Sequence, residues 1–305
     1  MIFLDPDSHK IKKAKLHHLD KLLDLIYVRI DKINNYFVKS WFDHFVNDHL
    51  EELISGDVNN AFELSSRLNI EMANNAVLKG YTIKVFNYDW FIDKVDSRYC
   101  GYDLAENLDI TTCTYCNRNF TNTIITKKGE KITRPQFDHF FDQKRHPFLS
   151  LSFYNLIPSC SICNSNVKHG IPFNPSTHAH PYLDKSMDEF KFTYDYSEDP
   201  YHKNGLRIGV EVEKDRLVYN LLKDLKIEEV YSSHTDLLFD MLKIKQAYSA
   251  KYLSILESQI LDGIKVSYSE IYRLAFGVFY EEKDFDKRPF SKFKKDILKE
   301  LNIIR

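Results

Sequence analysis

The stretch PQFDHFFDQKRHPFLSLSFYNLIPSCSICN, residues 135–164, decides how this chain is interpreted. It places the adjacent pair Asp138 and His139 upstream of a Cys-x-x-Cys motif that runs directly into Asn164. A second Cys-x-x-Cys motif lies earlier in the chain. An acid, a histidine and an asparagine therefore accompany two thiol pairs, and this combination requires a chemical explanation.

The cysteines predict a structural zinc site. Cys113-x-x-Cys116 is followed after forty-three residues by Cys160-x-x-Cys163, which gives two chelating pairs of soft ligands, with Cys100 left over. In a reducing cytosol this pattern favours metal thiolates over disulfides. Two unrelated pairs of reduced cysteines are the duller alternative, and a redox motif needs only one pair. Four thiolates would close the shell of a Zn²⁺ ion, which would then stabilise the fold and leave catalysis to other residues.

The overall composition predicts a globular protein. The chain has 305 residues, 43% of them hydrophobic and 28% charged, which is enough for one large domain or two to three small ones. No apolar run is long enough to span a bilayer, and the first residues carry charges where a signal peptide needs an apolar segment. We therefore expect a cytoplasmic protein that does not enter a membrane.

The charge is unevenly distributed. The net charge is −2, but residues 111–170 contain eight lysines and arginines against three acids, a local excess of five positive charges. The remainder of the chain then carries a net charge of −7. The segment that contains the cysteines is thus the part expected to meet a polyanion.

The first third of the chain predicts helices. Apolar residues recur at steps of three and four across residues 10–55, a stretch that Gly56 ends, and a second helical segment covers 58–79 and is stopped by Gly80. A core-packing role explains this apolar stripe better than a cofactor role. We predict an α-helical region over residues 1–105.

The middle of the chain changes period. Residues 120–140 contain two β-prone runs around a Lys-Lys-Gly-Glu turn, which predicts a hairpin with Asp138 and His139 at the end of its second strand. A short helix is expected after Cys160, ending near Gly170.

The last third mixes strands and helices. Residues 190–196 and 207–213 alternate as strands do, 215–262 returns to a helical pattern, and 288–303 predicts a basic amphipathic helix after Pro289. The fold class is therefore α+β and mainly α-helical. The expected domains are an α-helical region over 1–105, a central unit over 106–180, and a mixed, then mostly helical, region over 181–305.

The central motifs resemble the HNH endonucleases. The matching elements are CTYC, FDHF, YNLIPSCSICN and Lys168, in that order, and they cover roughly residues 110–172. The resemblance implies a ββα-metal fold, in which two strands and a helix surround one divalent ion and a four-cysteine zinc site often braces the unit.

The resemblance also implies roles for individual residues. His139 matches the general base, and Asn155 matches the asparagine that braces the loop and orients the base. Asp138 matches the acidic metal ligand, and Asn164 stands where the last histidine of the motif often sits. A carboxylate and an amide oxygen are hard ligands, which favours Mg²⁺ or Mn²⁺ over zinc at this second site.

These roles agree with the chemistry of phosphodiester hydrolysis. A histidine titrates in the range needed to deprotonate water near neutral pH, and a divalent ion would neutralise the charge that develops on the phosphate. Lys144, Arg145 and Lys168 are the expected phosphate contacts. The predicted function is a metal-dependent endonuclease acting on DNA, with RNA as an open alternative.

Each residue also has a structural interpretation. His139 could be a core histidine, Asp138 could cap a turn, Asn164 could cap a helix, and Asn155 is structural under either hypothesis. The alternative function is a zinc-ribbon module that binds nucleic acid or protein without catalysis. Such a module would have no use for the set of Asp138, His139 and Asn164.

The long flanking regions suggest a partner. Their layout is similar to that of nuclease subunits of bacterial anti-phage defence systems of the Septu type, which pair with an ATPase. The chain has no Gly-rich phosphate loop, so any ATPase activity would come from the partner. A nuclease held silent until a partner delivers it, and a homo-oligomer, are both compatible with this layout.

Overall fold

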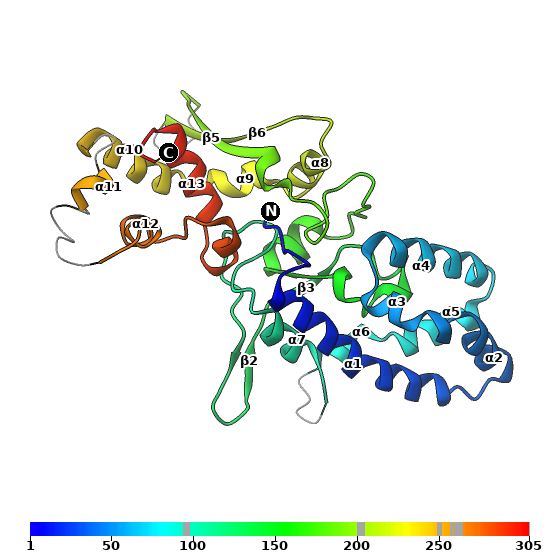
Figure 1. Cartoon of the computed structure of the whole chain (residues 1–305). Coiled ribbons are helices and arrows are strands. Elements are labelled where there is room, and N and C mark those ends of the chain that lie inside the picture. The colour runs from blue at the N-terminus through cyan, green and yellow to red at the C-terminus, as the bar shows by residue number, and fades with distance from the viewer. Residues whose placement is uncertain (94–97, 200–204, 249–251, 257, 259–264, 305) are drawn as a thin grey trace.

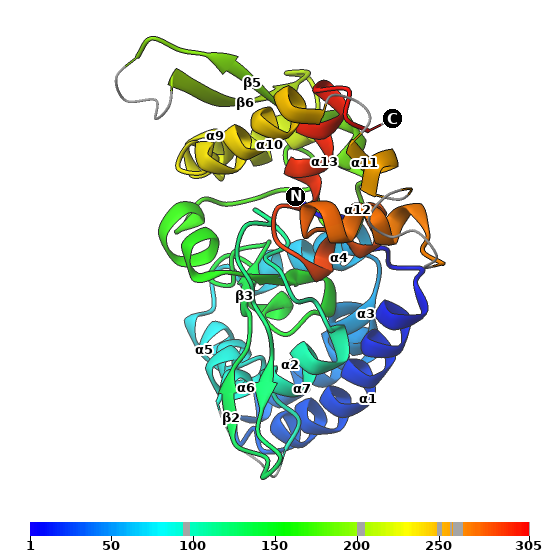
Figure 2. The ribbon, with the colours of Figure 1, turned by 90° about the vertical axis from the view of Figure 1, so that its left-hand side faces the viewer.

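The computed structural model describes residues 1–305 except 94–97, 200–204, 249–251, 257, 259–264 and 305. The described chain is mainly helical and contains three two-stranded antiparallel sheets. The prediction of a mainly helical α+β chain is therefore confirmed. In Figures 1 and 2 the N-terminal helices and the C-terminal region lie on opposite sides of the central segment.

The predicted continuous helix over residues 10–55 is wrong, because the segment folds as three helices. The side chain of Asn35 accepts a hydrogen bond from Val38 N at 3.1 Å and so begins a new helix. The helices of the N-terminal region are α1 (His9–Asp31), α2 (Tyr36–Phe45), α3 (Leu50–Ser55), α4 (Val58–Met72), α5 (Ala76–Val85), α6 (Tyr88–Ile92) and α7 (Gly101–Leu108), with a 3₁₀ turn at Asn47–His49.

Gly80 does not stop a helix, contrary to the prediction. The break falls earlier, where the Asn75 side chain accepts hydrogen bonds from two backbone N–H groups and begins α5. Helix α5 then continues through Gly80 and buries Leu78 and Val85. The burial and the cap outweigh the modest helix penalty of one glycine.

The central segment contains two small sheets. Strands β1 (Ile124–Ile125) and β2 (Lys131–Thr133) form the predicted hairpin, but Asp138 and His139 belong to a third strand, β3 (Gln136–His139). Strand β3 pairs with β4 (Leu156–Ser159), which was not predicted. All four residues of β4 are buried, so the strand lacks the alternation by which a half-buried strand is recognised.

Short helical turns complete this segment. Two 3₁₀ turns, Pro147–Leu149 and Phe153–Asn155, lie in the loop between β3 and β4. The short helix predicted after Cys160 is present as a π-helix, Ile162–Lys168, which we call the π-turn.

The C-terminal region contains the predicted ribbon of β5 (Phe190–Tyr196) and β6 (Leu206–Val212). Both outer edges are occupied: Phe192 N donates to the Asp296 carboxylate at 3.0 Å, and Val210 N donates to the Glu228 carboxylate at 2.9 Å. The remaining elements are a 3₁₀ turn at Ser186–Glu189, α8 (Leu217–Asp224), α9 (Ile227–Ser232), α10 (Thr235–Tyr248), α11 (Tyr252–Ile255), α12 (Tyr268–Phe276), a 3₁₀ turn at Glu282–Lys287, and α13 (Ser291–Glu300).

The predicted helix over 215–262 is divided, and part of it, at 249–251, 257 and 259–262, lies outside the described residues. Lys226 adopts a left-handed conformation (φ 48°) between α8 and α9 and turns the chain. The basic helix predicted over 288–303 is present as α13.

The first residues tie the regions together. Ile2 N donates to Thr114 O at 2.8 Å, and Leu4 N donates to Pro181 O at 2.9 Å. The buried apolar residues form one cluster that extends from Met1 to Ile304. Among the described residues, no helix combines the length and the apolar character that crossing a membrane requires.

One buried histidine links α1 to the central segment. His18 lies 2.8 Å (Nε2) from the Leu151 carbonyl and 3.1 Å (Nδ1) from the Tyr99 hydroxyl. A neutral ring satisfies both contacts if Nε2 donates to Leu151 and Nδ1 accepts from Tyr99. Burial lowers the pKa of His18 to about 4, partly opposed by the Leu151 carbonyl.

His18 should make stability depend on pH. Because its folded pKa is depressed, the unfolded chain binds a proton below about pH 6.5 while the folded chain does not, so stability falls as the pH falls from 6.5 toward 4. His18 should lower the free energy of unfolding by about 2 kcal/mol between pH 7 and pH 5, which urea unfolding can measure. His18→Gln should show a smaller loss over the same interval, and an unchanged pH dependence would contradict the assignment.

Candidate metal centre and the adjoining Asp-His site

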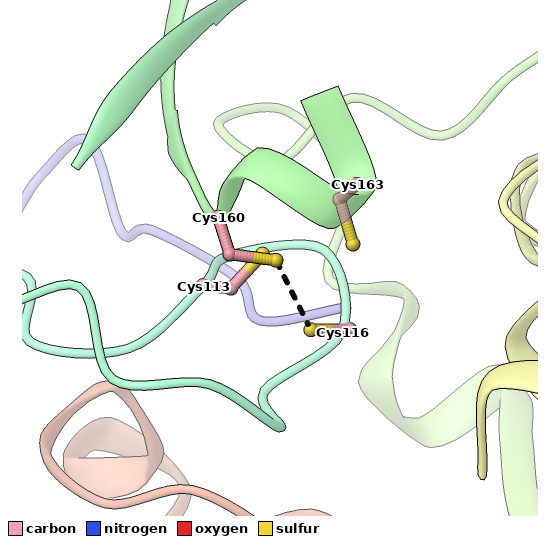
Figure 3. Close-up of side chains that lie close together, drawn as sticks. All are labelled: Cys113, Cys116, Cys160 and Cys163. Atoms are coloured by element: carbon pink, nitrogen blue, oxygen red, sulfur yellow. Dashed lines mark hydrogen bonds between the residues drawn. The ribbon is translucent and has the colours of Figure 1, made fainter. Parts of the chain in front are cut away.

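Four cysteines meet in the interior. The Sγ atoms of Cys113, Cys116, Cys160 and Cys163 all lie within 4.8 Å of one another, and all four residues are buried (Figure 3). A tetrahedral zinc ion with Zn–S bonds of about 2.3 Å would hold its sulfurs roughly 3.8 Å apart, and the Cys116 and Cys160 sulfurs are 4.0 Å apart. The predicted convergence is confirmed, and the cluster could hold a metal ion.

Local hydrogen bonds prepare the sulfurs for a metal. Asn117 adopts a left-handed conformation (φ 49°), and its N–H donates to Cys113 O at 2.8 Å, which closes a tight turn. Arg118 N donates to Cys116 Sγ at 3.4 Å, and Asn119 Nδ2 donates to Cys160 Sγ at 3.2 Å. Such donors favour thiolate over thiol, and thiolate is the form that binds a metal.

The π-turn packs against one face of β3. The side chains of Gln136 and Asp138 share this face because they are two residues apart on a strand. Gln136 Oε1 accepts hydrogen bonds from Asn164 Nδ2 and Ser165 Oγ, both at 3.1 Å, while Asp138 meets Lys168 one turn later. The strands β3 and β4 and the π-turn therefore form a compact strand-strand-helix unit beside the cysteine cluster.

Asp138 is the centre of a buried polar network. It is 4% exposed, and Lys168 Nζ lies 3.0 Å from Oδ1 and 2.8 Å from Oδ2. Tyr115, between the first two cysteines, donates its hydroxyl to Oδ2 at 2.6 Å, and Lys168 also donates to the His139 carbonyl. Burial raises the pKa of the Tyr115 phenol, which keeps it a hydrogen-bond donor.

This network corrects the expectation for Lys168. A phosphate contact requires an ammonium group that reaches solvent, whereas Lys168 is buried and paired with Asp138. Any phosphate contact in this segment would therefore come from its other basic residues.

The predicted Mg²⁺ or Mn²⁺ pair does not fit this arrangement. Both oxygens of Asp138 already accept hydrogen bonds from a cation or a hydroxyl, and a divalent ion on the same carboxylate would lie next to the Lys168 ammonium group. The amide of Asn164 is held by Gln136. A divalent ion at Asp138 would require Lys168 to move away.

His139 points toward different neighbours from those of Asp138. Its Nε2 lies 3.0 Å from the Ser150 carbonyl, and its ring meets the Tyr88 ring edge-on at 4.4 Å between centroids. Nδ1 has no hydrogen-bond partner among the described residues. Burial lowers the pKa of His139, while the Ser150 carbonyl and Asp138 oppose that effect, so the neutral imidazole is favoured.

Asn155 holds the loop that supplies the Ser150 carbonyl. Its Nδ2 donates to Leu149 O at 2.8 Å and to Phe141 O at 3.2 Å, and its Oδ1 accepts from Phe141 N at 2.7 Å. All polar atoms of this buried amide are thus used to join the end of the loop to its beginning at Phe141 and to its middle at Leu149. These contacts are those required of a loop brace.

The two remaining predicted substrate contacts lie on the surface. Lys144 and Arg145 are exposed in a turn where Asp142 Oδ1 accepts from both backbone N–H groups. Asn69 of α4 also donates to Arg145 O at 2.8 Å, so the backbone of the turn is fixed while both side chains face solvent. Their role in substrate binding stays a prediction.

Three contacting residues escaped sequence reasoning. Tyr115 could have been found, because it lies between two predicted zinc ligands. Gln136 lies two residues before Asp138 and shares its strand face. Tyr88, whose hydroxyl donates to Phe137 O at 3.1 Å, comes from α6 in the helical region, and no local pattern connects it to His139.

Comparison of the chain with protein-family models, with curated proteins and with solved structures finds no match. The candidate site is therefore interpreted from its own geometry and chemistry.

The cysteine cluster should determine the zinc content. Cys163→Ser should abolish stoichiometric zinc and lower the Tm by about 10 °C or more, because the remaining ligands no longer close the shell. Cys100→Ser is the matched control, since Cys100 is buried but lies outside the cluster. Elemental analysis and thermal unfolding measure both effects, and zinc retained in the first variant would disprove the assignment.

The Asp138–Lys168 pair should dominate the stability of the strand-strand-helix unit. Lys168→Met leaves a buried carboxylate without its cation and should cost about 3–5 kcal/mol of unfolding free energy. The exposed Lys144→Met should change stability by less than about 0.5 kcal/mol. Denaturant unfolding of the two variants compares them directly, and equal effects would show that the buried pair is energetically unimportant.

Proposed function

We propose that this chain is an endonuclease of the HNH type that hydrolyses phosphodiester bonds of DNA, with His139 as the general base. The observation that carries the proposal is the orientation of His139. Its imidazole is fixed by the Ser150 carbonyl on a loop clamped by Asn155, at the end of the strand that carries the buried Asp138.

The arrangement of hydrogen bonds gives His139 the form that a base needs. If Nε2 carries the proton and donates it to the Ser150 carbonyl, Nδ1 presents a lone pair. The lowered pKa keeps the ring neutral at physiological pH. His139 would take a proton from water, whose oxygen attacks phosphorus while the bond from phosphorus to the ester oxygen breaks. The leaving oxygen keeps the electron pair of that bond and takes a proton from solvent.

The metal assignments within the proposal differ in their support. Four buried thiols favour a structural Zn²⁺ ion in the cysteine cluster. The HNH resemblance would also place Mg²⁺ or Mn²⁺ on Asp138 and Asn164, where Lys168 now holds the carboxylate. We therefore assign no catalytic step to a divalent ion, and the assay below compares metal-loaded and chelated protein.

DNA is the proposed substrate because the central segment is locally basic. Residues 111–170 carry five excess positive charges, and Lys144 and Arg145 expose their side chains within that segment. Phosphate neutralisation by such residues supplies most sequence-independent affinity for nucleic acid. RNA substrates form a second arm of the assay.

A second candidate function is nucleic-acid binding without cleavage. The buried network around Asp138 favours it, because Tyr115 and Lys168 give this carboxylate a structural role that needs no catalysis. Under this alternative, replacement of His139 would leave every measured property of nucleic-acid binding unchanged.

The proposal extends to the cellular context only through layout. Long flanking regions around a small catalytic unit suit an effector that a partner such as an ATPase activates, as in anti-phage defence, or one that acts as a homo-oligomer. Addition of candidate partners to the cleavage assay tests this extension.

His139→Ala should abolish cleavage of supercoiled plasmid. Loss of a general base typically lowers the rate by about 100-fold to 10,000-fold. Zinc content should change little, because the His139 ring contacts Ser150 and Tyr88 and none of the four cysteines. His169→Ala is the matched control, since His169 is an exposed histidine directly after the π-turn.

The assay is run with Mg²⁺, with Mn²⁺ and with EDTA, on plasmid, single-stranded DNA and RNA. Undiminished cutting by His139→Ala would refute the assigned base. Activity in EDTA that matches activity in Mg²⁺ would exclude a required divalent ion at Asp138.

A further inference from the structure

The hairpin of β1 and β2 extends away from the body of the molecule in Figure 1, and in Figure 2 it lies in front of the N-terminal helices. We call residues 124–133 the basic hairpin. Gly129 N donates to Thr126 O at 2.8 Å, and Gly129 adopts the left-handed conformation (φ 84°) that such a turn needs. This turn places Lys127 and Lys128 at the apex.

The base of the basic hairpin is anchored on α7. Lys131 Nζ lies 3.3 Å from Cys100 Sγ, and the Arg134 guanidinium lies 5.5 Å from the ring centroids of both Tyr102 and Phe137. These contacts fix the direction in which the hairpin projects. The apex extends beyond them.

The outer part of the basic hairpin exposes both cations and aliphatic groups. Lys127 and Lys128 are exposed and form no ion pair among the described residues. Ile124 and Ile132 are 48% and 47% exposed, although they lie in strands. A two-stranded ribbon gains little stability from uncovered isoleucines, and two adjacent lysines repel each other. Binding to a polyanion that also offers apolar groups would relieve the repulsion between the lysines and would cover the isoleucines.

We propose that the basic hairpin docks in the major groove of duplex DNA. A groove about 12 Å wide admits a two-stranded β-ribbon and exposes thymine methyl groups, whereas the major groove of duplex RNA is too narrow for side chains to read. Lys127 and Lys128 contact phosphates at the groove edges, and the exposed isoleucines face the base edges.

The position of the hairpin along the chain connects it to the proposed active site. Only Arg134 and Pro135 separate β2 from β3, and His139 ends β3 about 10 Å from its first residue. The hairpin and His139 therefore lie on one continuous stretch of chain, which links the proposed docking surface to the proposed active site. The choice of DNA as partner rests on the proposed function, but the docking itself is tested separately from cleavage.

The test is a binding experiment with protein that does not cut. Lys127→Ala/Lys128→Ala is made in the His139→Ala background, and binding to a labelled 20-base-pair duplex is followed by fluorescence anisotropy at several salt concentrations. Affinity should fall at least about tenfold at low salt, and the slope of log K against log salt should shrink by about two.

The matched control is Lys13→Ala/Lys79→Ala in the same background. It removes the same charge from two exposed lysines of α1 and α5. The affinity for the duplex and the salt slope should stay near those of the parent. Duplex RNA of the same sequence should bind more weakly and should respond equally to the hairpin and control variants. Circular dichroism confirms that each variant is folded.

The outcomes separate this inference from the proposed function. Equal affinity and salt slope for the hairpin variant and its parent, or no binding of duplex DNA by the parent, overturns the docking surface. Binding that depends on the hairpin, by a wild-type chain that cuts nothing either alone or with the candidate partners added, supports the docking surface and refutes the endonuclease.

Discussion

The convergence of four thiols is the constraint on which the rest of the structure depends. It joins two chain segments that are forty-three residues apart and fixes both in the interior. The C-terminal region is built onto the same point, because Tyr231 donates its hydroxyl to Cys116 O and Phe290 N donates to Asn117 O, both at 2.6 Å. A metal ion bound by all four sulfurs would cross-link the two cysteine segments and so stabilise the fold.

The cluster is also mechanically connected to the candidate site. Tyr115 belongs to the first cysteine turn and bonds Asp138, while the second cysteine turn begins the π-turn that carries Asn164 and Lys168. Asp138 and His139 therefore depend on different supports, although they are adjacent in sequence. Asp138 is held by the cluster side, whereas His139 is held by the Asn155 loop and by α6.

Features that depend on a local pattern could be predicted from the sequence, whereas features that depend on tertiary contacts could not. The cysteine spacing, the alternation of β5 and β6, and the apolar period of the helices are local patterns. The first two led to correct elements, and the third identified helical segments without their breaks. The breaks at Asn35 and Asn75 depend on single capping side chains within otherwise helical patterns, and β4 is too buried to alternate. The pairing of Lys168 with Asp138 required knowledge of tertiary structure, because a lysine after a helical turn resembles any surface cation.

The ribbon of β5 and β6 has its backbone donors capped from both sides. Because Asp296 and Glu228 occupy N–H groups on its two outer edges, an incoming strand would have to displace a carboxylate before it could extend the sheet. The ribbon is thereby protected against edge-to-edge aggregation at high protein concentration. A protein that recognises this region through its side chains would avoid that displacement, whereas one that adds a strand would not.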